Sequence, residues 1–164
     1  MQAKDAENII AEEDAQPELP QASSGLEIRV LLVEDDAVDS ISVQRQLKSY
    51  SRASFHFTTA SRLEQALHCM DTAFFDVVLL DLNLPDSHGG ETLLRTLMHS
   101  AKIPVIIFSG NRNRNLPESA RDRGVYAYLV KDLGVVNQLP ETLHEAVLER
   151  RAAQADEAER NFQA

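Results

Sequence analysis

Five short apolar segments recur along the chain at similar intervals, and this alternation limits the possible folds more than any other feature. The segments start near residues 28, 54, 75, 104 and 125, so the intervals are 26, 21, 29 and 21 residues. Each interval has room for a strand, a crossover helix and two short loops. The segments are Ile28–Val33, Ser54–Thr59, Phe75–Leu82, Pro104–Ser109 and Val125–Val130. The alternation predicts a doubly wound α/β domain over residues 27–151, with a parallel sheet covered by helices on both faces.

The segment after the first strand has the signals of a helix. Asp36 is a candidate N-cap, and the helix is expected to run to Tyr50. Val38, Ile41 and Leu47 have helical spacing. We therefore expect this helix to pack on the sheet through these three side chains.

Helix signals follow the other strands as well. Ser61 and Glu64 have the spacing of a capping box that opens a second helix. A third helix is expected over Glu91–His99, and a weak, polar fourth helix over Leu116–Arg123. Pro140 lies near the start of a long last helix.

The net charge of −10 is unevenly distributed. Residues 1–26 hold six acids and one base and contribute −5, residues 27–151 contribute −3, and residues 152–164 contribute −2. The leader over residues 1–26 has few large apolar residues, which favours a flexible or disordered segment. Residues 152–164 are rich in alanine and charge, and we interpret them either as a helical extension that needs a partner or as a frayed tail.

Composition excludes several classes of protein. An acidic chain without a basic block lacks the positive charge that non-specific DNA binding requires. Cys69 is the only cysteine, which excludes a scaffold held by internal disulfides. No apolar stretch is long enough to span a bilayer, and the N-terminus has no signal-peptide pattern. These features predict a cytoplasmic protein without direct nucleic-acid or membrane binding.

Chemically active side chains lie at the ends of four of the five strands. Glu34 and Asp35 follow the first strand, Asp81 lies near the end of the third, Ser109 ends the fourth and Lys131 follows the fifth. The carboxyl ends of parallel strands meet at one edge of the sheet, where doubly wound folds bind their ligands. One lysine cannot balance three acids, whereas Mg²⁺, which prefers oxygen ligands, can. The set is typical of phosphoryl transfer to a carboxylate, with Asp81 as the nucleophile.

Each of these residues also has an ordinary structural explanation. The acids at 34–36 suit a helix N-terminus, Asp81 suits an Asx turn and Ser109 suits a common loop. Lys131 could be a surface lysine, and Tyr128 a core residue whose hydroxyl is hydrogen-bonded. Their combination at one edge of the sheet favours the functional interpretation.

Three motifs resemble the receiver domain of two-component response regulators. Their order and spacing fit that family over residues 27–151, about three-quarters of the chain. The motifs are Leu31-Leu32-Val33-Glu34-Asp35-Asp36, Val78-Leu79-Leu80-Asp81-Leu82-Asn83-Leu84-Pro85-Asp86 and Tyr128-Leu129-Val130-Lys131. The resemblance implies a flavodoxin-like sandwich of three layers, with the five strands in the order 2-1-3-4-5.

The resemblance also implies where phosphorylation and metal binding occur. Asp81 would be the phosphoacceptor. Glu34, Asp35 and Asp81 would hold Mg²⁺ together with the main-chain carbonyl of Asn83. Glu34 stands where the family more often has aspartate, which lengthens one ligand arm without removing the carboxylate.

Further roles implied by the resemblance concern signalling. Ser109 and Lys131 would contact the phosphoryl group, and Ser109 and Tyr128 would form the switch. A histidine kinase or histidine phosphotransfer protein would donate the phosphoryl group. A downstream protein target would bind the face formed by the fourth helix, fifth strand and fifth helix, and no separate substrate turnover is expected.

Three positions near the site depart from the family pattern or tune it. Asp132 follows Lys131 where most receivers have a proline, which puts the geometry of the next loop in question. Asn83 and Asn111 lie two residues beyond Asp81 and Ser109, at positions that influence the rate of dephosphorylation in receivers.

Two alternatives remain open from the sequence. A phosphatase with an aspartate nucleophile needs a second aspartate two residues after the first, and Asn83 occupies that position. A degenerate receiver would bind partners without phosphorylation, although the complete set of site residues argues against it.

Overall fold

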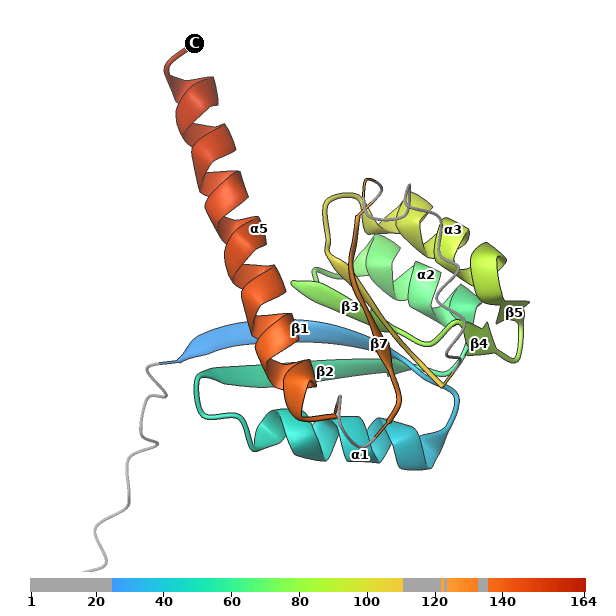
Figure 1. The fold of residues 1–164 in the computed structure, drawn as a ribbon. Helices are drawn as coiled ribbons and strands as arrows, with labels where there is room; N and C mark the ends of the chain where they lie inside the picture. The colour runs from blue at the N-terminus through green and yellow to red at the C-terminus, as the bar shows by residue number, and fades with distance from the viewer. Residues whose placement is uncertain (1–24, 111–121, 123, 133–135) are drawn as a thin grey trace, which may run out of the picture.

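A parallel five-stranded sheet forms the centre of the computed structural model, which describes residues 25–110, 122, 124–132 and 136–164 (Figure 1). The strand order is β2-β1-β3-β6-β7, and all neighbours are parallel. The strands are β1 (Leu26–Val33), β2 (Ala53–Ala60), β3 (Val77–Leu80), β6 (Val105–Ser109) and β7 (Val125–Val130). Because β6 and β7 are the fourth and fifth strands of the sheet along the chain, this order confirms the predicted 2-1-3-4-5 topology.

Helices cover both faces of the sheet, as Figure 1 shows. They are α1 (Ala37–Lys48), α2 (Leu63–Thr72), α3 (Gly89–Ser100) and α5 (Leu139–Phe162), with a 3-10 turn at Val136–Gln138 before α5. The predicted leader lies outside the described residues up to residue 24, and so does almost all of the predicted fourth helix.

Successive residues of the central strands alternate between two hydrophobic clusters. In β1, Leu31 and Val33 pack with α2 and α3, whereas Val30 and Leu32 pack with α1 and α5. All four side chains are at most 2% exposed. A parallel strand buried on both faces needs this continuous apolar sequence, which explains why the strands could be recognised without polar alternation.

The orientation of α1 differs from the prediction. Asp36 is its N-cap, as expected, and accepts hydrogen bonds from the backbone of Val38 at 2.8 Å and of Asp39 at 2.9 Å. The buried residues of the helix are Val43 and Leu47, however, while Val38 and Ile41 are 75% and 57% exposed. The predicted apolar face was therefore wrong at two of its three positions. Val43, one helical turn before Leu47, faces the sheet in place of Val38 and Ile41.

The predicted capping box at the start of α2 does not form. The N-cap of α2 is Arg62, and its side chain makes no capping hydrogen bond with the described residues. Instead, the carboxylate of Asp86 accepts from the backbone N–H groups of Leu63 at 2.8 Å and Glu64 at 3.1 Å. A side chain from a distant loop thus satisfies the free donors at this helix start.

The loop after β3 contains the two-stranded hairpin of β4 (Asn83–Leu84) and β5 (Ser87–His88). Thr92, in the first turn of α3, donates to the backbone carbonyl of Leu82 at 3.0 Å, and its hydroxyl is 2.8 Å from that of Ser87. These buried contacts fix the loop against α3 directly beyond Asp81.

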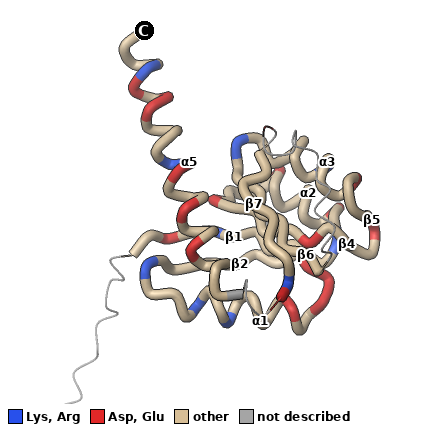
Figure 2. Tube along the Cα trace, viewed as in Figure 1, with Lys and Arg blue, Asp and Glu red and all other residues tan. Residues whose placement is uncertain are grey.

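Helix α5 is one continuous helix of 24 residues, with Pro140 in its first turn as predicted. Leu139, Leu143 and Val147 are buried against the sheet, whereas every residue from 151 onward is exposed. Acidic and basic residues intersperse along this projecting part (Figure 2). The predicted extended C-terminal helix is confirmed.

Candidate functional site

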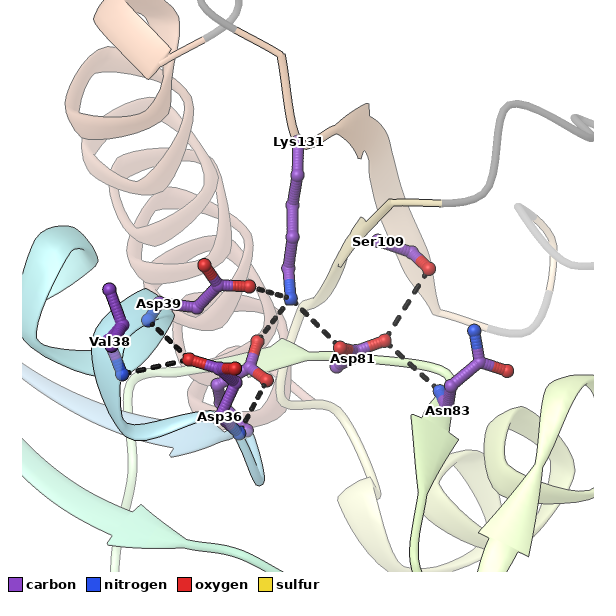
Figure 3. A network of polar contacts seen from close by, with 8 residues as sticks. Asp36, Val38, Asp39, Asp81, Asn83, Ser109 and Lys131 are labelled. Carbon is purple, nitrogen blue, oxygen red and sulfur yellow. Dashed lines mark hydrogen bonds and ion pairs between the residues drawn. The ribbon is translucent and has the colours of Figure 1, made fainter.

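Four strand ends place the candidate residues at one edge of the sheet (Figure 3). Glu34 follows β1, Asp81 follows β3, Ser109 is the last residue of β6, and Lys131 follows β7. The N–H of Asp81 donates to the carbonyl of Val33, and the N–H of Lys131 donates to that of Ser109, both at 2.9 Å. These backbone hydrogen bonds hold the end of β3 beside that of β1 and the end of β7 beside that of β6, so the side chains that follow converge at one edge.

Lys131 lies among three carboxylates. Its Nζ donates to Asp81 Oδ2 and Asp39 Oδ2, each at 2.9 Å, and to Glu34 Oε2 in a shorter contact. Burial alone would lower the pKa of Lys131, but the hydrogen bonds to Glu34, Asp81 and Asp39 raise it above its usual value. The ammonium is therefore charged at neutral pH, and each of its three N–H groups has a partner.

Asp81 is 8% exposed, yet both of its oxygens have partners. Besides the ion pair of Oδ2 with Lys131, Oδ1 accepts from the Asn83 N–H at 3.0 Å and from the Ser109 hydroxyl at 3.4 Å. These bonds hold the carboxylate in one orientation at the edge. A buried carboxylate among hydrogen-bond donors is suited to nucleophilic attack when a positive charge stabilises the incoming group.

Glu34 and Asp35 add two more carboxylates beside Asp81. One oxygen of each of these three residues lies within 4.8 Å of the other two. Burial raises the pKa of Glu34 above its usual value, and hydrogen bonds from Lys131 and from the Asp36 N–H offset this only in part. The concentration of negative charge and the all-oxygen donor set fit a hard divalent cation such as Mg²⁺.

Asp39 belongs to this site and was not recognised in the sequence. It lies in the first turn of α1, and its carboxylate contacts Lys131 (Figure 3). Its position carried a signal, because Asp39 lies in the first helical turn after the acidic residues at 34–36. Figure 2 shows acidic positions gathered near the start of α1.

The two predicted switch residues lie in neighbouring strands. Ser109 is fully buried at the end of β6. Tyr128 in β7 is partly buried and packs against the hydrophobic cluster under α2 and α3.

Asp132, which stands where most receivers have a proline, donates from its backbone N–H to the carbonyl of Val130 at 2.8 Å. Asn111, which was expected to tune the site, lies outside the described residues.

Comparison with known proteins agrees with this geometry. A family model described as the response regulator receiver domain matches residues 30–144, more than half of the chain. The chain belongs to the response regulator receiver family. Receiver domains are modules of two-component signalling, and members of this family generally signal rather than act as enzymes.

Curated relatives of this receiver domain include the cell cycle response regulators CtrA of Brucella ovis and Brucella anthropi. Each is 39% identical over 83 residues, which cover 51% of this chain and 34% of the relative. The chain therefore matches about a third of the length of these relatives.

Solved structures share the fold. A CheY-like receiver domain from Methanospirillum hungatei superposes with a TM-score of 0.66 at 21% identity, covering 79% of this chain and 99% of that one. The receiver domain of the sensor histidine kinase PA1611 from Pseudomonas aeruginosa gives 0.61 at 22% identity, covering 74% and 98%, and has a magnesium ion coordinated in its active-site cleft. In the described part of the present chain, no helix is long and apolar enough to cross a membrane.

Proposed function

We propose that Asp81 is the phosphoacceptor of this receiver domain and takes its phosphoryl group from a histidine kinase or a histidine phosphotransfer protein. The observation that carries the proposal is the buried Asp81 carboxylate, held between Lys131 and Ser109. No other carboxylate among the described residues combines burial at the carboxyl edge of the sheet with both a lysine and a hydroxyl donor.

The proposed step is an in-line displacement at phosphorus. One Asp81 oxygen forms a P–O bond while the bond from phosphorus to the donor nitrogen breaks. The leaving imidazole keeps the electron pair and takes up a proton from solvent. Lys131 and Ser109 donate hydrogen bonds to the transferred oxygens, so this chain supplies positioning and charge rather than proton transfer.

The residues that would hold Mg²⁺ are Glu34, Asp35 and Asp81, with the main-chain carbonyl of Asn83. When bound, the ion supplies neutralisation of the negative charge that accumulates on the phosphoryl oxygens. The excess of carboxylates over ammonium groups supports this assignment, because Lys131 alone leaves the cluster negative.

We further propose that phosphorylation draws Ser109 and Tyr128 towards the new phosphoryl group. The rearrangement would change the face that β7 and α5 contribute to, and a downstream protein would bind there. Residues 27–151 would form the receiver domain, residues 1–26 a flexible leader and residues 152–164 a helical extension, in a cytoplasmic protein.

Intact mass after incubation with a small acyl phosphate and Mg²⁺ tests the acceptor. We expect the wild type to gain one phosphoryl group and Asp81→Asn to gain none. Asp71→Asn, in an exposed aspartate that pairs with His99 on the outside of the molecule, is the matched control and should be phosphorylated like the wild type. The proposal fails if the wild type gains no mass or if Asp81→Asn gains as much.

Separate substrate turnover is not expected. An aspartate-nucleophile phosphatase needs a second carboxylate two residues after the nucleophile, whereas Asn83 offers an amide there. Sustained hydrolysis of a generic phosphate ester that Asp81→Asn abolishes would instead establish the phosphatase. A protein that binds its partners equally well with and without phosphorylation would be a degenerate receiver.

A further inference from the structure

Asp39 is the third carboxylate on Lys131, and it comes from a helix rather than from a strand end. Its Oδ2 is 2.9 Å from Lys131 Nζ, the same distance as Asp81 Oδ2. The ammonium therefore lies between α1 and the acceptor, as Figure 3 shows. Asp39, Val43 and Leu47 are spaced by four residues, so the side of α1 that packs on the sheet also delivers this carboxylate.

The hydrogen-bonding capacity of Lys131 is already used. An ammonium group has three N–H donors, and Glu34, Asp39 and Asp81 each accept from Nζ. A phosphoryl group on Asp81 adds oxygens that need donors. Lys131 can donate to one of these oxygens only if one of its three carboxylate partners gives up its hydrogen bond.

The three carboxylates differ in how easily they can leave. The side chain of Glu34 is 3% exposed, so water cannot take the place of the ammonium at this carboxylate. Asp81 is the residue that carries the new group. The side chain of Asp39 is 45% exposed, so water can replace the ammonium. An open groove beside the pair, lined in part by Ser42 and Gln46, gives Asp39 room to turn outward.

We propose that Asp39 is a positioning residue that competes with the phosphoryl group for Lys131. In the unphosphorylated domain it draws the ammonium towards α1, and on phosphorylation Lys131 exchanges the Asp39 carboxylate for a phosphoryl oxygen. The exchange replaces one N–H···O contact by another, and all protons stay on Nζ. This inference rests on the proposed function, because it assumes that Asp81 accepts the phosphoryl group.

The first test compares phosphorylation rates by intact mass, with an acyl phosphate and Mg²⁺. Asp39→Asn removes the competing charge at nearly constant shape and is expected to raise the rate about two- to fivefold, the range for one half-exposed ion pair. Asp39→Glu keeps the charge and should restore a rate close to that of the wild type. Asp36→Ser removes a charge at the N-terminus of the same helix without contacting Lys131 and still offers an N-cap oxygen, so its effect should be less than half that of Asp39→Asn.

A second measurement does not depend on phosphoryl transfer. In the unphosphorylated wild type without Mg²⁺, the three hydrogen bonds should protect the Lys131 ammonium from solvent exchange, which ¹H–¹⁵N NMR of the lysine side chains detects. Asp39→Asn should shift this signal and speed its exchange, whereas Asp36→Ser should leave it in place. With Mg²⁺ and beryllium fluoride as a phosphoryl analogue, the carboxyl ¹³C signal of Asp39 should move to that of a solvated aspartate.

The outcomes separate the two proposals. A wild type that is phosphorylated, with Asp39→Asn at the same rate and an unchanged Lys131 signal, overturns the role of Asp39 alone. An equal acceleration by Asp36→Ser also overturns it, because general charge would then explain the effect. A wild type without phosphoryl uptake overturns the proposed function and this inference with it.

Discussion

The carboxylate of Asp86 accepts a hydrogen bond of 2.8 Å from the backbone N–H of Leu63, 23 residues earlier in the chain. A second bond from Glu64 completes a cap on α2 that is supplied by the loop beyond Asp81. The Asp86 carboxylate therefore couples the start of α2 to the conformation of the loop that follows Asp81.

This cap can be tested with a pair of substitutions. Asp86→Ala should lower the free energy of unfolding by about 1 kcal/mol, the usual cost of losing an N-cap side chain. Ser61→Ala should change it by less than about 0.5 kcal/mol, because Ser61 does not cap the helix. Urea unfolding measures both, and a larger loss for Ser61→Ala would mean that the local capping box forms in solution.

The rotation of α1 predicts unequal costs for two apolar positions. Leu47→Ala should lower the free energy of unfolding by about 2–5 kcal/mol because Leu47 is fully buried. Ile41→Ala should stay within about 0.5 kcal/mol of the wild type because the side chain is mostly exposed. Equal losses in chemical denaturation would place Ile41 in the core and contradict the observed orientation.

Asp76 predicts a pH-dependent contribution to stability. Burial alone would raise its pKa, but hydrogen bonds from the Arg29 N–H at 2.8 Å and from the Arg151 guanidinium at 3.2 Å lower it below the usual 3.8. A carboxyl whose pKa is lower in the folded state stabilises the fold above its unfolded pKa, and the contribution is lost as pH falls through the folded value.

Asp76→Asn should therefore cost about 2 kcal/mol at pH 7, in the range for hydrogen bonds to a charged group. The difference from the wild type should shrink as the pH falls below about 3.8. Urea unfolding at pH 7, 5 and 3 measures it. A difference that does not vary with pH would mean that the charge of Asp76 is not involved.

Magnesium should stabilise the folded domain through Asp35. At a Mg²⁺ concentration ten times the dissociation constant, the free energy of unfolding should rise by about 1.4 kcal/mol, and a chelator should reverse the gain. Asp35→Asn should lose most of this gain, while Asp36→Ser should retain it because Asp36 is not one of the clustered ligands. Thermal unfolding with and without Mg²⁺ measures this stabilisation. A full stabilisation of Asp35→Asn by Mg²⁺ would contradict the metal assignment.

The sheet could be predicted because its strands are buried on both faces and so appear as uninterrupted apolar segments. Val77 to Leu80 are four buried apolar residues in a row, and polar residues at four of the five strand ends mark the same edge. The grouping of Glu34, Asp81, Ser109 and Lys131 therefore followed from the sequence alone.

The details that failed depend on tertiary contacts. α1 has apolar residues on two sides, so periodicity alone could not choose between Ile41 and Val43 as the buried residue. Asp39 was missed for the same reason, because its approach to Lys131 depends on that rotation. The cap on α2 comes from Asp86, and no local pattern can report a partner so distant in the sequence.

The length of α5 turns a small movement into a large one. At 1.5 Å per residue its 24 residues form an arm of about 36 Å, so a tilt of about 10° about its first turn carries the far end through about 6 Å. Beyond Arg151, the exposed ion pair of Lys102 with Glu157 opposes such a tilt only weakly. The helix therefore multiplies a displacement at Val147, about 12 Å along its axis, about threefold at its far end.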